Sequence, residues 1–201
     1  MNLRSPISDL LPGARGQVVS VLAQLGRPLT VRALAQHAGV SPQTALDTVN
    51  DLADVGLVRA DRAGQALMVS LNRDHLLAEP LSEMVETRGR LVIRLSEHLT
   101  TWKHLAGAWL FGSAARGDGD RHSDIDVLAV ADSSTDTEDW IESTSKLHGL
   151  VELWTGNPLQ LVEHTRASFG ELVRSDSPLV DSIRQDGLPL RAASRSLLRP
   201  S

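Results

Sequence analysis

The stretch from Gly112 to Asp126 constrains the fold of this chain more than any other part of the sequence. It places a Gly-Ser turn after an apolar segment, then a polar loop, then Asp124 and Asp126 at the start of a second apolar segment. Side chains alternate between the two faces of a strand, so these carboxylates point to one face, roughly 7 Å apart along the backbone. The stretch predicts two strands joined through a short turn, with paired acids at the start of the second.

The residue types in this stretch also indicate a chemistry. Two carboxylates at that separation can share a Mg²⁺ ion, which prefers carboxylates together with substrate phosphates. A Gly-Ser turn at the start of a helix offers backbone N–H groups and a hydroxyl to phosphate oxygens. A solvated acidic loop between two strands is the plainer alternative. The combination favours nucleotide chemistry.

The same stretch resembles the motif of the minimal nucleotidyltransferases of the DNA polymerase β-like superfamily, Gly-Ser-x-x-Arg-Gly-Asp, a short loop, then Ser-Asp-x-Asp. The matching residues are Gly112, Ser113, Arg116, Gly117, Asp118, Ser123, Asp124 and Asp126. The resemblance implies transfer of a nucleoside monophosphate from a nucleoside triphosphate, with ATP expected, to an acceptor hydroxyl. It also implies Mg²⁺, or Mn²⁺ in its place, as the cofactor.

Residue roles follow from the resemblance by position. Asp124 and Asp126 would be catalytic and would hold the metal, whereas Gly112 and Ser113 would hold the β- and γ-phosphates. Arg116 is the third expected nucleotide-binding residue, and two roles for it remain open. It either neutralises phosphate charge or pins the loop to a neighbouring aspartate.

One position departs from the family pattern. The family carries a third carboxylate on the next core strand, where this chain has Gln160. Glutamine cannot act as a base, and its loss should slow proton transfer by roughly 10²–10⁴-fold if nothing replaces it. Glu163 has the opposite strand parity and should face away. Nucleotide binding with weakened chemistry is therefore an alternative to full activity.

The first eighty residues predict three helices followed by a hairpin. Apolar residues repeat at helical spacing in each helix, Thr30 and Ser41 are suited to cap the second and third, and glycines follow all three. Two alternating segments, 57–61 and 65–71, are joined by an expected tight turn at Ala63-Gly64. This order is that of a winged helix-turn-helix, and residues 30–58 resemble regulators of the MarR and ArsR type.

That resemblance implies a DNA interface on the helix from Pro42 to Val55 and on the hairpin. The expected base contacts are Gln43 and Thr44. The expected phosphate contacts are Arg32, Arg59 and Arg62. The same helix carries Asp47, Asp51 and Asp54, which are unfavourable near phosphates, so a partner-binding module is the alternative to a reader of double-stranded DNA.

The remaining segments complete an α+β fold. We expect a winged helix-turn-helix at 1–75, a linking helix within 76–104, a nucleotidyltransferase domain at 105–191 with a small mixed β-sheet flanked by helices, and a disordered tail at 192–201. Apolar residues at helical spacing from Pro80 to about Lys103 predict one long helix, which either packs the two domains together or forms the seam of a homodimer.

Composition limits where and with what the chain works. It has no cysteine and no apolar run near the roughly 18 residues that cross a bilayer, so we expect a cytoplasmic protein without a membrane partner. The net charge of −5 excludes a broad basic surface for nucleic acid. Because minimal nucleotidyltransferases often act as antitoxins beside HEPN-domain toxins, a HEPN-type partner is one expectation. A transcriptional regulator with a nucleotide-sensing domain is the alternative function.

Overall fold

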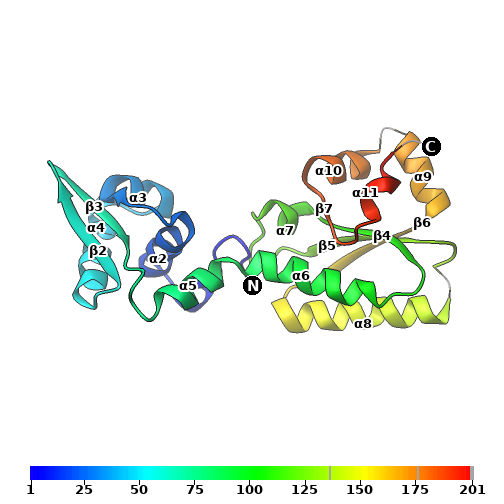
Figure 1. Cartoon of the computed structure of the whole chain (residues 1–201), viewed down its shortest axis with the longest axis horizontal. Coiled ribbons are helices and arrows are strands. Elements are labelled where there is room, and N and C mark those ends of the chain that lie inside the picture. Colours follow the sequence, from blue (N-terminus) through cyan, green and yellow to red (C-terminus); the bar gives the residue numbers. More distant parts are fainter. Residues whose placement is uncertain (136, 176, 200–201) are drawn as a thin grey trace. The chain divides into compact units, whose positions relative to one another are not determined.

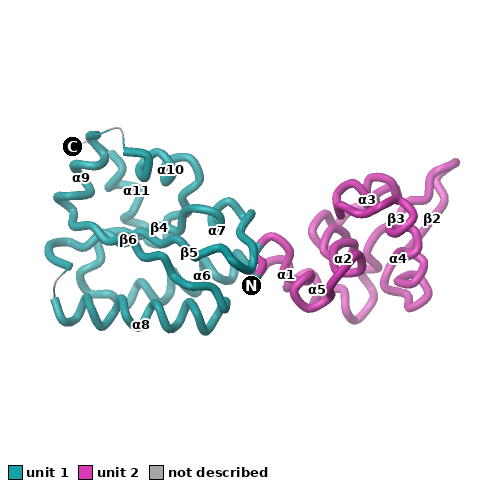
Figure 2. Tube along the Cα trace, turned by 180° about the vertical axis from the view of Figure 1, so that it is seen from behind, with its two compact units in different colours: residues 1, 3, 88–201 teal, residues 2, 4–87 magenta. Residues whose placement is uncertain are grey.

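The computed structural model describes residues 1–135, 137–175 and 177–199, which form two compact units. The N-terminal unit comprises residue 2 and Arg4–Thr87, and the C-terminal unit comprises residues 1 and 3 and the chain from Arg88 onward (Figure 2). The division falls within the segment that was expected to be a single linking helix.

The N-terminal unit is a winged helix-turn-helix (Figure 1). Its elements are α1 (Pro6–Leu10), α2 (Ala14–Leu25), β1 (Leu29–Thr30), α3 (Val31–Ala38), α4 (Pro42–Asp54), β2 (Val58–Ala63), β3 (Ala66–Leu71) and α5 (Ala78–Val85). The strands form an antiparallel sheet in the order β1-β3-β2. The helices enclose a core of apolar side chains that includes Val18, Leu34 and Val49.

The expected helix ends are confirmed in this unit. The Thr30 side chain accepts a hydrogen bond from the backbone N–H of Ala33, and Ser41 accepts one from that of Thr44. Gly26 and Gly39 end α2 and α3 in the left-handed conformation. The hairpin turn lies one residue later than expected, because Ala63 still pairs with Ala66 and the loop is residues 64–65.

The C-terminal unit is built on a four-stranded mixed sheet. Its elements are α6 (Thr87–Thr100), β4 (Leu105–Phe111), α7 (Gly112–Arg116), β5 (Ile125–Ala131), α8 (Glu138–Thr155), β6 (Leu159–Thr165), α9 (Arg166–Arg174), α10 (Pro178–Asp186), β7 (Leu188–Pro189) and α11 (Ser194–Leu197). The first residue of α6, Thr87, belongs to the N-terminal unit, and the rest of the helix belongs to this one. The strand order is β6-β5-β4-β7. β5 runs parallel to β6, and β4 is antiparallel to both of its neighbours.

The two faces of this sheet carry separate cores. Figure 1 shows α6 and α8 on one side of the sheet and α9 and α10 on the other. Val127 and Ala129 of β5 point toward α6 and α8, whereas Leu128 and Val130 point toward α9 and α10. This alternation follows from the period-two geometry of a strand that is buried on both sides. It also decides which acids of the sequence can meet, because even-numbered residues of β5 share the face of α9 and α10.

The long helix expected from Pro80 to Lys103 is two helices, α5 and α6, separated at Glu86. The physical reason is that the two halves of its apolar stripe pack in different cores. Leu81 belongs to the core of the N-terminal unit, whereas Leu91 and Leu95 belong to that of the C-terminal unit. A straight helix is not required when its two halves serve separate cores.

The tail expected to be disordered from Ala192 is ordered as far as the described residues reach, Arg199. It forms α11, and the fully buried Ser194 accepts a hydrogen bond from the Ala108 N–H (2.9 Å) and donates one to the Ala108 carbonyl (2.9 Å). Residues 200–201 lie outside the described residues. Among the helices described, none has the length and apolarity that a membrane crossing requires.

Candidate nucleotide and metal site

The chain turns sharply where β4 ends. Gly112 has φ +66°, a conformation that costs an L-residue energy. A Cβ atom at Gly112 would stand 2.1 Å from Asp126 Oδ2, far inside van der Waals contact. Only glycine therefore allows the carboxylate of β5 to lie directly against the turn that opens α7. The turn and the acid expected to act together are held next to each other.

Asp124 and Asp126 lie at the start of β5 as expected. Asp126 is the second residue of the strand and pairs with Phe111 of β4, while Asp124 is exposed just before the strand. Burial raises the pKa of the half-buried Asp126 carboxyl, the charge of Asp124 raises it further, and Arg116 opposes both. Two nearby negative charges in this setting favour a bound cation.

Gln160 lies beside Asp126 in the sheet. The parallel register pairs these two residues directly, so their side chains share one face, that of α9 and α10. Glu163 pairs with Ala129, which faces α6 and α8, and its Oε2 accepts a hydrogen bond from Trp140 Nε1 of α8 (2.5 Å). The nearest carboxylate of β6 is thus on the opposite face, and an exposed amide occupies the place beside the aspartate pair.

The motif loop is held by its own polar side chains. Arg116 Nε donates to Asp118 Oδ2 (3.2 Å). Of the two roles that were open for Arg116, this contact corresponds to pinning the loop to a neighbouring aspartate. Asp120 accepts from the backbone N–H of His122 (2.8 Å), and this bond is the largest cause lowering the pKa of the Asp120 carboxyl. These aspartates order the loop through local hydrogen bonds.

Two further residues hold the site, and no sequence pattern indicated either of them. The buried Asn157 donates through Nδ2 to the carbonyls of Asp120 (3.2 Å) and Ser123 (2.8 Å). Arg88 Nη1 donates to the carbonyl of Ala115 at the end of α7 (2.6 Å). Both bridge segments that are distant in sequence, so no local pattern could have identified them.

The side chains around the aspartate pair are the candidate ligands for the Mg²⁺ ion that the resemblance implies. Among the described residues no three His, Cys, Asp or Glu side chains lie close enough together to hold a metal ion. Two carboxylates close enough to affect each other's charge, with Gln160 paired to one of them, fit Mg²⁺. This ion commonly takes only one or two protein carboxylates and completes its shell with phosphate and water. The residues present fit such an ion bound together with a nucleotide.

Ser113 is free for a ligand of this kind. Its carbonyl accepts from the backbone N–H groups of Gly117 (2.9 Å) and Asp118 (3.1 Å), which fixes the turn. Its side chain lies against Gly119, where an added Cβ would stand 3.1 Å from Ser113 Oγ. Within the described part of the chain this hydroxyl makes no hydrogen bond.

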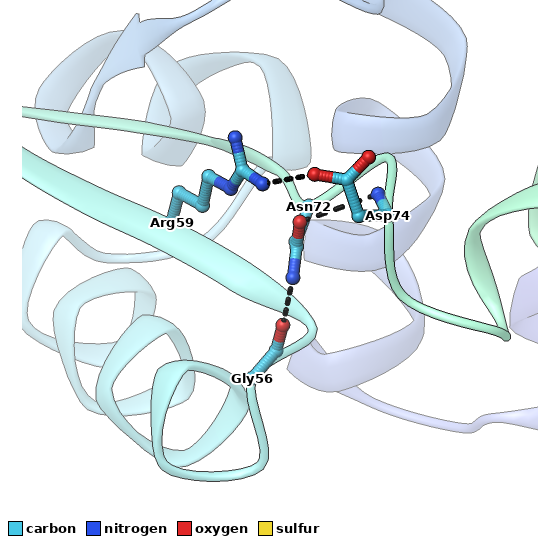
Figure 3. A network of polar contacts seen from close by, with 4 residues as sticks. All are labelled: Gly56, Arg59, Asn72 and Asp74. Atoms are coloured by element: carbon cyan, nitrogen blue, oxygen red, sulfur yellow. Dashed lines mark hydrogen bonds and ion pairs between the residues drawn. The ribbon is translucent and has the colours of Figure 1, made fainter.

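The residues expected to contact DNA are distributed over the N-terminal unit, and three of them are engaged. Gln43 Nε2 donates to Asp47 Oδ1 (2.7 Å), and the Thr44 hydroxyl is hydrogen-bonded to that of Ser41 (2.7 Å). Arg59 forms an ion pair with Asp74 (Figure 3).

Asp74 is held in place by the network drawn in Figure 3. Asn72 accepts from the Asp74 backbone N–H (3.3 Å) and donates to the Gly56 carbonyl (2.8 Å). Arg32 and Arg62 are exposed and have no ion-pair partner among the described residues. The expected DNA surface therefore has two unpaired arginines rather than three.

Comparison with protein families finds a known domain in one region of the chain. Residues 94–175 match the family described as polymerase beta, nucleotidyltransferase. The match runs from within α6 past the end of α9 and includes the glycine turn, the aspartate pair and Gln160. The C-terminal unit thus contains a nucleotidyltransferase domain, joined in this chain to a winged helix-turn-helix. No curated protein matches the chain.

Solved structures resemble parts of the chain at low similarity. The toxin-antitoxin complex with AMP-PNP is 23% identical, with a TM-score of 0.34 and coverage of 56% of this chain and 77% of that one. The antimony-specific transcriptional repressor AntR is 24% identical (TM-score 0.33; 45% and 77% covered). NadR in complex with 4-hydroxyphenylacetate is 18% identical (TM-score 0.36; 46% and 69% covered). No functional conclusion rests on these three.

Proposed function

We propose that the C-terminal unit binds a nucleoside triphosphate charged with Mg²⁺, ATP in the first place, and transfers its nucleoside monophosphate to an acceptor hydroxyl. The observation that carries this proposal is the packing of the Asp126 carboxylate against the Gly112 turn, with the charge of Asp124 acting on the same carboxyl. That arrangement puts negative ligands for a cation next to a turn and a hydroxyl suited to phosphate.

Each residue has a defined part in this proposal. Asp124 and Asp126 hold the metal, and Ser113 and the Gly112 turn bind the β- and γ-phosphates. Arg116 lies close enough to Asp126 to influence its pKa and supplies positive charge at the edge of the site. Bound Mg²⁺, or Mn²⁺ in its place, would neutralise charge on the transferred phosphoryl group. The chain's own contribution is to fix the position of the triphosphate.

The transfer requires a group that accepts one proton from the acceptor hydroxyl. The acceptor oxygen forms a bond to the α-phosphorus, the bond from that phosphorus to pyrophosphate breaks, and the acceptor hydroxyl loses its proton. Gln160 has no basic group to take it, and Glu163 is held on the other face by Trp140. The proton would therefore pass to solvent or to the acceptor's own groups, and the transfer would be slow.

This departure favours a second candidate function. The C-terminal unit would bind nucleotide or a partner protein with weak chemistry, and the winged unit would bind double-stranded DNA through Gln43, Thr44 and the three arginines, as a transcriptional regulator. A HEPN-type protein, as in a toxin-antitoxin pair, and a second copy of this chain are the protein partners to test. Both functions place the protein in the cytoplasm.

The experiment that tests the first proposal is incubation of the protein with ATP labelled at the α-phosphate, Mg²⁺ and cell extract. We expect a labelled macromolecule that is absent with Asp124→Asn or Asp126→Asn and retained with Asp181→Asn, an exposed acid that is paired with Arg184 of its own helix. Absence of label, with ATP binding by calorimetry that the same two variants abolish, would favour the regulator. Absence of both label and binding would exclude nucleotide chemistry.

A further inference from the structure

A cavity of about 300 Å³ lies in the C-terminal unit between α9 and the segment that contains α11. Figure 1 and Figure 2 both show these two helices side by side. The volume is at the lower end of the range of about 300–1,000 Å³ that is usual for small-molecule sites. The cavity can therefore hold a ligand of modest size.

This cavity is separate from the aspartate pair. Arg166 of its wall is paired with Asp132 (2.7 Å), which directly follows the last residue of β5. Leu197 of its wall stands over Gly107, which pairs with Val130 near the same end of that strand. The aspartate pair lies where β5 begins, so the cavity and the pair are at opposite ends of the strand.

The charged residues that line the cavity are all arginines. They are Arg166, Arg174 and Arg199, and within the described part of the chain no acidic residue lines the cavity with them. Arg166 is neutralised by Asp132, whereas Arg174 and Arg199 have no ion-pair partner among the described residues. The whole chain has more acidic than basic residues, 25 against 20. Two uncompensated guanidinium groups around one cavity therefore depart from the character of the chain.

Gly170 shows how the side chain of Arg174 lies. A Cβ atom added at Gly170 would stand 3.6 Å from Arg174 Nη1. The guanidinium group therefore lies back along α9, over Gly170, and Gly170 itself lines the cavity. This position keeps the positive charge of Arg174 at the cavity wall.

The rest of the wall is mainly apolar and offers these arginines no acceptor. Phe169 and Val173 are buried in the core beneath α9, and Leu197 packs against the same core. The hydroxyl of Ser196 donates to the Ala193 carbonyl of its own helical turn (2.7 Å). Apolar surroundings strengthen the attraction between a guanidinium group and an anion, because water screens the charges less.

We propose that this cavity binds a phosphate group, free or carried by a small molecule, through the guanidinium groups of Arg174 and Arg199, with Arg166 beside them. A guanidinium group matches the oxygens of a phosphate with two parallel hydrogen bonds. A phosphate monoester carries about −1.5 to −2 charges at pH 7, which balances two unpaired arginines better than the single charge of a carboxylate does. Binding here needs neither Mg²⁺ nor the aspartate pair.

The experiment follows backbone amide signals of the intact protein by ¹⁵N NMR while inorganic phosphate is added without Mg²⁺, at an ionic strength held constant with NaCl. We expect saturable shifts of the signals of Gly170 and Ser196. The signal of Gly149, a helical glycine of α8 with nothing within 4 Å of its added Cβ, should stay in place. A shift at Gly112 without one at Gly170 would place the phosphate at the nucleotide site and overturn the proposal.

Two further anions test the chemistry of the ligand. Acetate should bind about tenfold more weakly than inorganic phosphate, because it carries one charge. Equal affinity for acetate would contradict the assignment to phosphate. Phenyl phosphate distinguishes the two sources of the group. Tighter binding of this ester than of inorganic phosphate shows that the apolar wall accepts the rest of a small molecule, and equal binding identifies free phosphate as the ligand.

Substitutions at exposed positions give the matched test. Arg174→Gln and Arg199→Gln should each weaken phosphate binding about three- to tenfold, because an exposed charge-assisted contact is lost. Asp132→Asn, which frees Arg166, should strengthen it. Arg184→Gln removes an exposed cation of α10 outside the cavity and should leave binding unchanged. The proposal is overturned if phosphate shifts neither Gly170 nor Ser196, or if both arginine variants bind it as tightly as the unaltered protein.

Discussion

At the scale of single residues, Asp126 combines two unfavourable features, partial burial and a neighbouring negative charge, and both raise the pKa of its carboxyl above the ordinary 3.8. Between the unfolded and folded pKa values the folded protein binds more protons than the unfolded chain. Stability therefore falls as pH rises through that window, and the full penalty remains at neutral pH. A carboxylate kept at this cost without a cation is typical of a functional site.

Asp126→Asn should consequently raise the melting temperature of the metal-free C-terminal unit at pH 7, by the order of a degree or two because the group is only partly buried. The difference should disappear below pH 3.8, where the carboxyl is neutral in both states. All four tryptophans lie in this unit, so their fluorescence reports its melting. Asp181→Asn is the control, and an equal rise there would contradict the assignment.

Gly112 gives a second prediction at this scale. Gly112→Ala combines a positive φ with a collision against Asp126, and it should lower stability by about 2–4 kcal/mol and abolish nucleotide binding. Gly156→Ala is the matched control, because Gly156 has φ +69° in the same unit with nothing within 4 Å of its added Cβ. It should cost only about 1 kcal/mol. Equal losses of stability in the two variants, measured by urea unfolding, would show that the contact with Asp126 is unimportant.

At the scale of elements, the register of β6 on β5 decides the chemistry that the C-terminal unit can perform. Pairing of Asp126 with Gln160 brings an amide to the position beside the aspartates. A shift by one residue would exchange the two faces of β6 and bring other side chains there. The register is fixed by burial of β5 on both faces, so a carboxylate can be restored at this place only by substitution.

Gln160→Glu should therefore increase nucleotidyl transfer by about 10²–10⁴-fold, if proton removal limits the reaction. Gln160 is exposed, so the substitution should leave folding intact. Glu163→Gln, on the opposite face, should leave the rate of transfer unchanged. The measurement is release of pyrophosphate from ATP that carries its label in the β- and γ-phosphates, in the presence of the cell extract that supplies the acceptor. An unchanged rate in Gln160→Glu would show that the missing base is not what limits this protein.

Local signals predicted the elements well because their causes are local. The caps at Thr30 and Ser41 and the glycines after the helices depend on residues within four positions of one another. The same holds for the strand parity that separates Glu163 from Gln160. The spacing of the motif residues also predicted that the glycine turn and the aspartate pair lie on adjacent elements.

The features that the sequence did not reveal all depend on contacts between distant residues. The hydrogen bonds of Asn157 to the motif loop span 34 and 37 positions, and those of Ser194 to Ala108 span 86. The prediction of a disordered tail was wrong for this reason, because the polar composition of the tail does not indicate that Ser194 is buried. The break between α5 and α6 was missed because a single apolar stripe does not disclose that its halves pack in different cores.

At the scale of the whole molecule, charge limits any binding of nucleic acid. The chain carries a net charge of −5, and the segment 4–87 holds seven arginines against nine acidic residues. The helix expected to enter the major groove, α4, carries three aspartates and no basic residue. Arg59 is neutralised by Asp74, and Arg15 by Asp51 (2.9 Å). Affinity for DNA would therefore rest on a few phosphate contacts.

This argument predicts a weak dependence of DNA binding on salt. Phosphate contacts by the two unpaired arginines, Arg32 and Arg62, would give a slope of log affinity against log salt of about −2, and Arg62→Ala should reduce its magnitude by about one. Asp47→Asn and Asp54→Asn together should raise the affinity for any duplex, because they remove repulsion near the phosphates. Fluorescence anisotropy with labelled duplexes between 50 and about 200 mM salt measures both effects. If the aspartate variants bind no duplex more tightly than the unaltered chain does, α4 does not face DNA. That result would favour the alternative, in which the winged unit binds a protein partner.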